Sequence, residues 1–392
     1  MLHELINHNP DLKRLQDEGY KLELRDKHLL VHRIPYVNSS SEIGEGVLVT
    51  DLELAGNKTV KPKNHVIYFI GDQPCNKEGS EITGIIHNTT TQKLSNAITV
   101  NRSFSNKPKP NGYKDYYHKI TRYIEIISAP AISMDSSKTA RVYEVIEASK
   151  DESVFNYMDT NSTRAEIGVI SEKLEGHKIG IIDLGGTGSY ILDQIAKTPV
   201  QEIYLFDGDR FLQHNAFRSP GAPSIKQLTK QHFKTDHFKR IYSNMHRGIK
   251  SHPNYLDESN LSSLIKLNFV FLCIDKGSAK KVIIEYLISR KIPFIDVGLD
   301  VNIAEESLLG TIRSTLVTEY MTDHVPNRIT MMDRDADEYA SNIQIADLNA
   351  LNAIMAVIKW KKYVQFYQDQ EREYSSFYDT NVNEMHNADY QS

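Results

Sequence analysis

The sequence predicts a chain of two parts, in which a smaller α+β domain at residues 1–157 precedes an α/β domain at residues 158–392 with a mainly parallel sheet. Length is the first observation, because 392 residues exceed the ~150 residues of a typical domain. The second is a change near residue 157 from short strands and turns to strands that alternate with helices. A glycine-rich turn between the first of these strands and its helix is the third.

The composition is that of a globular protein. Hydrophobic residues make up 40% and charged residues 25%, which excludes disordered, collagen-like and disulfide-scaffold classes. The net charge of −5 gives no large positive field, so nucleic acid is not expected as the main partner. No stretch approaches the ~18 apolar residues of a membrane span, and residues 1–15 lack the features of a secretion signal. We therefore expect a cytoplasmic protein without a membrane partner.

The first domain consists of short strands and turns around a few helices. Residues 11–18 predict a short helix, and residues 21–37 and 65–71 predict strands. Residues 103–117 are rich in turn formers. A polar segment at residues 151–168 then leads into the second domain.

The second domain alternates strands with helices, which predicts parallel strands joined by right-handed crossovers. Strands of the buried type are expected at residues 177–184, 200–209, 267–275 and 291–299. Helices are expected at residues 185–199, 277–291 and 343–367. The last helix is apolar on most of its circumference, so it needs burial in the core or against a second subunit. We expect the polar tail after Gln368 to be partly mobile.

The glycine turn lies where parallel sheets bind nucleotides. Gly185, Gly186 and Gly188 have no side chains, so the backbone can approach a ligand and the N–H groups at the helix start can receive an anion. A tight structural turn would also use glycines here. Asp207 and Asp209 follow Gly185 by slightly more than the ~20 residues at which an acid reaches a ribose hydroxyl. A nicotinamide-dependent oxidoreductase would show the same features.

The turn after the second strand of this domain favours a nucleotide triphosphate. It contains Asn215 and Arg218 and is followed by Lys226, Lys230 and Lys234. Arginine binds phosphate oxygens bidentately and lysine binds them as a point charge, whereas plain NAD does not need these groups at this place.

Asp275 ends the third strand of this domain, at the sheet edge where ligands bind. A carboxylate here suits Mg²⁺, which takes one or two carboxylates together with phosphate oxygens. The same residue can cap the helix that follows, and the two roles are compatible.

Residues 181–218, IIDLGGTGSYILDQIAKTPVQEIYLFDGDRFLQHNAFR, resemble the signature of the ThiF/MoeB adenylating enzymes, the superfamily of ubiquitin-activating-enzyme-like and MccB-like enzymes. The signature runs G-x-G-G-x-G-S, D-x-D, N-x-x-R, a lysine, and an Asp at the end of a third strand. Five separated elements occur here in that order, and the resemblance covers roughly residues 160 to 365. It implies a Rossmann-like ThiF/MoeB adenylation domain.

The resemblance also implies a reaction, in which the C-terminal carboxylate of a ubiquitin-like protein or peptide attacks the α-phosphate of ATP with Mg²⁺ present. The products would be an acyl-adenylate and pyrophosphate. By this resemblance the expected roles are nucleotide contact for Gly185, Gly186 and Gly188, ribose binding for Asp207 with Asp209 beside it, phosphate contact for Asn215, Arg218 and Lys234 with Lys230 in reserve, and Mg²⁺ binding for Asp275. Family members place an upstream arginine in the partner subunit's site, and Arg164 has the comparable position, which implies a homodimer.

Three departures from the family pattern stand out, and one of them is the ambiguous lysine spacing, since Lys226, Lys230 and Lys234 fall within nine residues. Asp183 occupies the place of the first glycine of the loop, so a negative charge lies near a turn that should receive phosphate. If its side chain points at the ligand, ATP affinity falls or the site is inactive, and if it points toward Arg or Lys neighbours, little changes. The usual Arg-Gln pair is replaced by Arg218-Ser219, followed by Pro220, so that turn must differ locally.

The two cysteines leave the later steps open. Cys273 lies in an apolar strand and is expected to be a packed core thiol, so the adenylation domain lacks the usual thioester cysteine. Cys75 follows a strand of the first domain and is the other candidate nucleophile. Either it accepts the adenylated tail, as in a conjugating module, or the first domain only captures a partner. The alternatives to adenylation are a nicotinamide-dependent oxidoreductase and an inactive nucleotide-binding scaffold.

Overall fold

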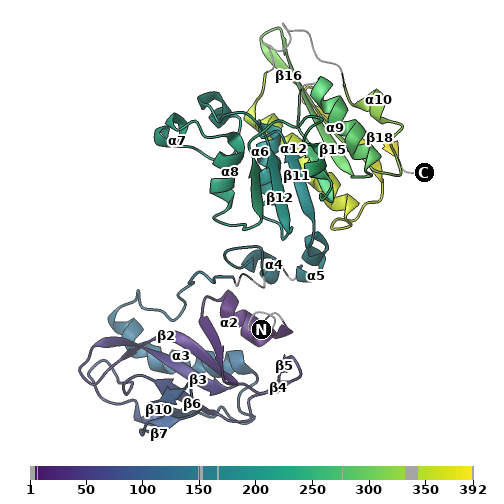
Figure 1. Ribbon diagram of the computed structural model, residues 1–392. Helices are drawn as coiled ribbons and strands as arrows, with labels where there is room; N and C mark the ends of the chain where they lie inside the picture. Colours follow the sequence, from purple (N-terminus) through teal and green to yellow (C-terminus); the bar gives the residue numbers. More distant parts are fainter. Residues whose placement is uncertain are drawn as a thin grey trace. The chain divides into compact units, whose positions relative to one another are not determined.

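The computed structural model describes residues 5–6, 8–148, 150, 153–165, 167–275, 277–331 and 343–390. The chain divides into two compact units, Met1–Ile146 and Glu147–Ser392 (Figure 1). Ala148, Ser153 and Asn156 belong to the second unit, where Arg247 donates hydrogen bonds to the carbonyls of the first two and to the side chain of the third. None of the described helices is long and apolar enough to cross a membrane.

The first unit is an antiparallel six-stranded sheet with a long helix against it. Tyr116, Ile120, Tyr123 and Ile127 recur at helical spacing on one face of α3, and this face is buried against apolar side chains of β2. The strand order is β1-β2-β3-β6-β10-β7. The elements are α2 (Pro10–Asp17), β1 (Lys21–Arg25), β2 (His28–Val37), β3 (Ile43–Asp51), β4 (Leu54–Ala55), β5 (Lys58–Thr59), β6 (Val66–Ile70), β7 (Ile86–Asn88), β8 (Gln92–Lys93), β9 (Thr99–Val100), β10 (Arg102–Ser105) and α3 (Tyr116–Met134).

The second unit is built on an eight-stranded sheet of order β13-β12-β11-β14-β15-β16-β17-β18. The first five of these strands are parallel, and β15 through β18 pair antiparallel, which confirms the predicted α/β class with a mainly parallel core. The strands are β11 (Lys178–Ile182), β12 (Glu202–Phe206), β13 (Ile249–His252), β14 (Phe269–Leu272), β15 (Phe294–Ala304), β16 (Ser307–Val317), β17 (Glu373–Asp379) and β18 (Glu384–Tyr390). The helices are α4 (Thr160–Arg164), α5 (Gly168–Ser171), α6 (Thr187–Ile195), α7 (Ile225–Thr229), α8 (Lys234–Tyr242), α9 (Gly277–Ser289), α10 (Val325–Arg328) and α12 (Ala346–Tyr363).

Both faces of the parallel strands are covered, which explains their nearly continuous apolar sequences. Ile179 and Ile181 point into one core with α6, α8 and α12, while Ile182 points into the other with α9. Trp360 of α12 is fully buried in the first core. The apolar helix predicted near residue 355 is therefore packed mainly within its own chain.

The strand order reverses at β11, because the chain runs from β11 outward to β12 and β13 and then crosses to β14 on the other side. The chain therefore leaves the carboxyl ends of β11 and β14 in opposite directions. Open α/β sheets bind their ligands in the crevice at such a point. Asp183 follows β11, Asp207 follows β12, and Asp275 lies just beyond β14.

The expected mobility of the tail after Gln368 is wrong, since β17 and β18 form two strands of the main sheet. Polar composition was misleading because β17 buries polar side chains, including a carboxylate that is paired with lysines. Glu373 is 7% exposed and accepts hydrogen bonds from Lys359 (3.1 Å) and Lys362 (3.0 Å) of α12.

Candidate functional site

A cavity of about 520 Å³ lies at this topological switch point, and we call it the nucleotide cavity. Most of the residues singled out in the sequence meet there, although they come from five separate segments. Its wall includes Asp183, the three turn glycines, Asp207, Asp209, Arg218, Lys234 and Asp275.

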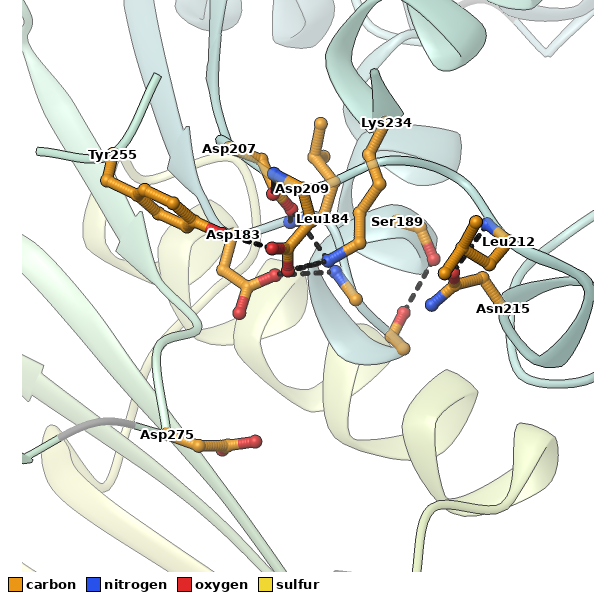
Figure 2. Close-up of polar contacts among 12 residues, drawn as sticks. Asp183, Leu184, Ser189, Asp207, Asp209, Leu212, Asn215, Lys234, Tyr255 and Asp275 are labelled. Atoms are coloured by element: carbon orange, nitrogen blue, oxygen red, sulfur yellow. Dashed lines mark hydrogen bonds and ion pairs between the residues drawn. The ribbon is translucent and has the colours of Figure 1, made fainter. Parts of the chain in front are cut away.

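Three carboxylates surround one buried lysine in the cavity wall (Figure 2). Nζ of Lys234 lies 2.8 Å from Asp209 Oδ2, 3.1 Å from Asp207 Oδ2 and 3.6 Å from Asp183 Oδ1. Lys234 begins α8 and its side chain is 5% exposed, whereas the Asp183 and Asp209 side chains are 32% and 50% exposed. The Lys234 side chain is therefore more deeply buried than the carboxylates of Asp183 and Asp209.

The carboxylate of Asp207 is locked in place by the backbone. Its Oδ2 accepts the N–H of Leu184 and its Oδ1 accepts the N–H of Asp209, both at 2.8 Å. Burial and the charge of Asp183 raise the pKa of Asp207 to about 7, although Lys234 and the Leu184 N–H oppose this shift. Burial alone would lower the pKa of Lys234, but the charges of Asp183 and Asp207 outweigh it and raise that pKa.

The three turn glycines are required for different reasons. A Cβ on Gly188 would lie 1.9 Å from the carbonyl oxygen of Asp183, and one on Gly186 would lie 2.2 Å from the side chain of Asn349. These two glycines let α6 pack close to β11 and α12. A Cβ on Gly185 would meet only Asp183 Oδ1, at 3.4 Å, so this glycine leaves the cavity open.

Arg218 brings a guanidinium to the cavity at the end of the short 3₁₀ turn Gln213–Phe217. Its Nε is buried and has no hydrogen-bond partner among the described residues. A buried donor without a partner is costly, so this atom is suited to an anionic ligand. Asn215 shapes the same turn, since it is 2% exposed and its Oδ1 accepts the N–H of Leu212 at 2.8 Å. Asn215 does not line the cavity.

Asp275 lies at the β14 side of the cavity, where Gln344 Nε2 donates to its Oδ2 at 3.2 Å. Within the part of the chain that the structure describes, no three His, Cys, Asp or Glu side chains form a metal-binding group. One accessible carboxylate still fits Mg²⁺, because this ion is commonly held by one or two carboxylates and by substrate phosphates.

The remaining predicted residues lie outside the cavity wall. Lys230 is exposed at the end of α7, and Arg164 ends α4. Cys75 belongs to the first unit and is fully buried, with its Sγ donating to the carbonyl of Gln73 at 3.3 Å. Burial raises the pKa of the Cys75 thiol. Cys273 lines the nucleotide cavity as well as contacting the core, and burial raises its pKa too.

Tyr255 and Asn349 are among the cavity residues that the sequence analysis did not single out. Tyr255 donates a hydrogen bond to Asp209 Oδ1, which raises the pKa of Tyr255 to about 12 (Figure 2). Asn349 is 1% exposed and accepts a hydrogen bond from Thr187 Oγ1 at 2.9 Å. Asn349 could have been found, because an asparagine at a buried position of the apolar helix 343–367 is unusual. Tyr255 could not, because an exposed tyrosine in a loop carries no such signal.

Fold and site together define a nucleotide-binding α/β domain of the doubly wound type. The sequence model of the ThiF family matches residues 158–387, more than half of the chain, so the chain belongs to the ThiF family of adenylating enzymes. Residues 10–160 match a family described as a domain of unknown function, DUF6791. No curated protein sequence matches the chain.

Solved structures with a similar fold include E. coli MccB bound to MccA-N7isoASN, with 15% identity and a TM-score of 0.44, covering 56% of this chain and 66% of that one. E. coli MccB with ATP has 17% identity and a TM-score of 0.44, with coverage of 56% and 65%. PaaA, in its selenomethionine form, has 16% identity and a TM-score of 0.44, with coverage of 57% and 76%. The match thus spans just under two thirds of the MccB chain.

Proposed function

We propose that the second unit binds ATP in the nucleotide cavity and adenylates the C-terminal carboxylate of a ubiquitin-like protein or peptide. One observation carries this proposal. The glycine turn, Asp207, Arg218, Lys234 and Asp275 come from separate segments of a ThiF-family chain and line the same cavity.

The reaction transfers no proton. An oxygen of the substrate carboxylate forms a bond to the α-phosphorus, the bond from that phosphorus to the bridging oxygen of the β-phosphate breaks, and pyrophosphate leaves with the electron pair. The protein has to align two anions and neutralise the leaving group. The orphaned Nε of Arg218 and the ammonium of Lys234 are suited to this task.

In this proposal Asp207 holds the ribose, and its carboxylate is kept beside the glycine turn by two backbone N–H groups. Asp275 would bind Mg²⁺, which would supply positive charge to the phosphates. Val297 and Leu299 of β15 and Asn349 of α12 also line the cavity.

Arg164 supports a homodimer in this proposal. It does not line the nucleotide cavity of its own chain, so a role in catalysis requires the site of a second copy. Mixing Arg164→Ala with Asp275→Ala should then restore activity that neither variant has alone, whereas a mixture as inactive as its components would argue against shared sites.

The first unit is better suited to capturing the partner than to carrying the acyl group. The Cys75 thiol is 0% exposed and has a raised pKa, and both properties disfavour a thiolate nucleophile. We therefore place acyl transfer through Cys75 second to direct use or release of the adenylate.

Ligand-dependent unfolding provides the first test. ATP with Mg²⁺ at 100 times its dissociation constant should stabilise the protein by ~2.7 kcal/mol, whereas NAD should not. Stabilisation by NAD and not by ATP would favour an oxidoreductase and overturn the proposal.

Exchange of labelled pyrophosphate into ATP tests the chemistry, with a synthetic peptide ending in Gly-Gly as the first acceptor. We expect Asp275→Ala to lower the exchange rate by about 100-fold or more, since its loss removes charge stabilisation at the phosphates. Asp323→Ala changes an exposed carboxylate outside the cavity wall and is the matched control. Equal exchange rates in the two variants would remove Asp275 from the mechanism.

A further inference from the structure

Asp183 adopts a backbone conformation that is typical of glycine, which is the residue that the family pattern has at this position. Its φ is +69°, in the left-handed region where Gly, Asn and Asp are the residues most often found. Asp tolerates this conformation, so it can stand where the family pattern has glycine. At this position the chain therefore carries a carboxylate where the family pattern has no side chain.

The carboxylate of Asp183 folds over the turn it belongs to. Its Oδ1 accepts the N–H of Gly185 at 2.8 Å and lies 3.6 Å from Nζ of Lys234. The open space in front of Gly185 contains no other atom within 4 Å of a Cβ built there. The side chain thus makes the two contacts, a turn N–H and a lysine ammonium, that an anionic group of a bound nucleotide would make.

The cavity is also negatively charged without a ligand. Among the described residues that line it, Asp183, Asp207, Asp209 and Asp275 face only Arg218 and Lys234 as cations. A metal-free triphosphate carries more negative charge than its Mg²⁺ complex, so it is repelled more strongly by this wall. Asp183 is 32% exposed, so its side chain can leave the turn without unfolding the core.

We infer that Asp183 is an internal competitor of the nucleotide, which occupies the Gly185 N–H and Lys234 until a phosphate group displaces it. It sets a weak affinity for ATP and makes binding depend on Mg²⁺. This inference rests on the proposed function, because it takes the nucleotide cavity as the ATP site.

Calorimetric titration of the full chain with ATP, in MgCl₂ and separately in EDTA, tests the inference. Asp183→Gly frees both contacts at a φ that glycine adopts without strain, and Asp183→Asn removes the charge but keeps an acceptor for Gly185. We expect affinity to rise in the order Asp, Asn, Gly, with ~10-fold or more from Asp to Gly, because a charge-assisted hydrogen bond no longer has to be broken. The gain should be larger in EDTA.

Glu305→Gly is the matched control, since Glu305 also has a positive φ, +56°, but lies in the turn between β15 and β16. It should leave ATP affinity unchanged. Wild type that binds ATP as tightly as Asp183→Gly, with or without Mg²⁺, would overturn the inference and leave the proposed function standing. Absence of ATP binding in wild type and in all variants would overturn both.

Discussion

Gly188→Ala should destabilise the second unit, because the added methyl group meets backbone. The Cβ would lie 1.9 Å from the carbonyl oxygen of Asp183 and 3.4 Å from Cβ of Cys273, whereas carbon atoms pack at about 3.5 Å or more. Strand or helix must move to make room, which typically costs ~1–3 kcal/mol. Alanine is the better helix former by ~1 kcal/mol, so this gain offsets only part of the loss.

The single tryptophan of the chain reports on this unit alone. Trp360 is fully buried, and its ring lies edge-on to His177 and to the core residue Phe271. Its fluorescence should therefore follow the unfolding of the second unit. The clash cost less the gain in helix propensity leaves a net loss of up to ~2 kcal/mol, which corresponds to a fall in Tm of up to roughly 8 °C for a domain of this size.

Gly185→Ala is the paired variant, because its Cβ meets only Asp183 Oδ1. We expect its stability to stay within about 0.5 kcal/mol of wild type, while its ATP binding weakens because the methyl group enters the cavity. Equal stability of Gly188→Ala and Gly185→Ala would refute this division into a packing glycine and a ligand glycine.

Three further predictions concern other parts of the chain. Burial lowers the pKa of Lys119 to about 8, so on raising the pH the native state loses this proton before the unfolded state does. The free energy of unfolding should therefore rise by up to ~3 kcal/mol between about pH 8 and pH 10.5. Urea unfolding of Lys119→Met, followed by circular dichroism, should lack this rise, and an identical pH profile would contradict the argument. Cys75 should react with iodoacetamide far more slowly in native than in urea-unfolded protein, and equal rates would show that the thiol is accessible. Arg328→Ala removes a bidentate ion pair with Asp389 and should speed amide exchange in β18 more than in β17, which hydrogen-exchange mass spectrometry can measure.

Much of the second unit could be predicted from its sequence, because parallel strands buried on both faces leave apolar runs separated by turns. The runs at 177–184, 200–209 and 267–275 contain β11, β12 and β14, and the polar residues at their ends meet at one edge for topological reasons. The same logic predicted α12 from its length and its apolar surface.

The contacts within the site could not be predicted in the same way. The contact of Asp183 with Lys234 depends on the backbone φ of Asp183 and on a lysine more than fifty positions later in the chain. Sequence spacing alone left three lysines as candidates for that place. Tyr255 reaches Asp209 from a loop without any motif. β17 was missed because Glu373 makes its beginning look like surface until Lys359 is placed next to it.

The C-terminal hairpin has a consequence for any shortened form of this protein. β17 pairs with β16 from Asp379 opposite Thr311 to Ser375 opposite Thr315, so β16 is an interior strand only while the hairpin is present. A chain truncated near residue 370 would expose unpaired backbone N–H and C=O groups along β16. An exposed strand edge of this kind can pair with a strand of another molecule, so we expect the truncated protein to aggregate and not simply to lose activity.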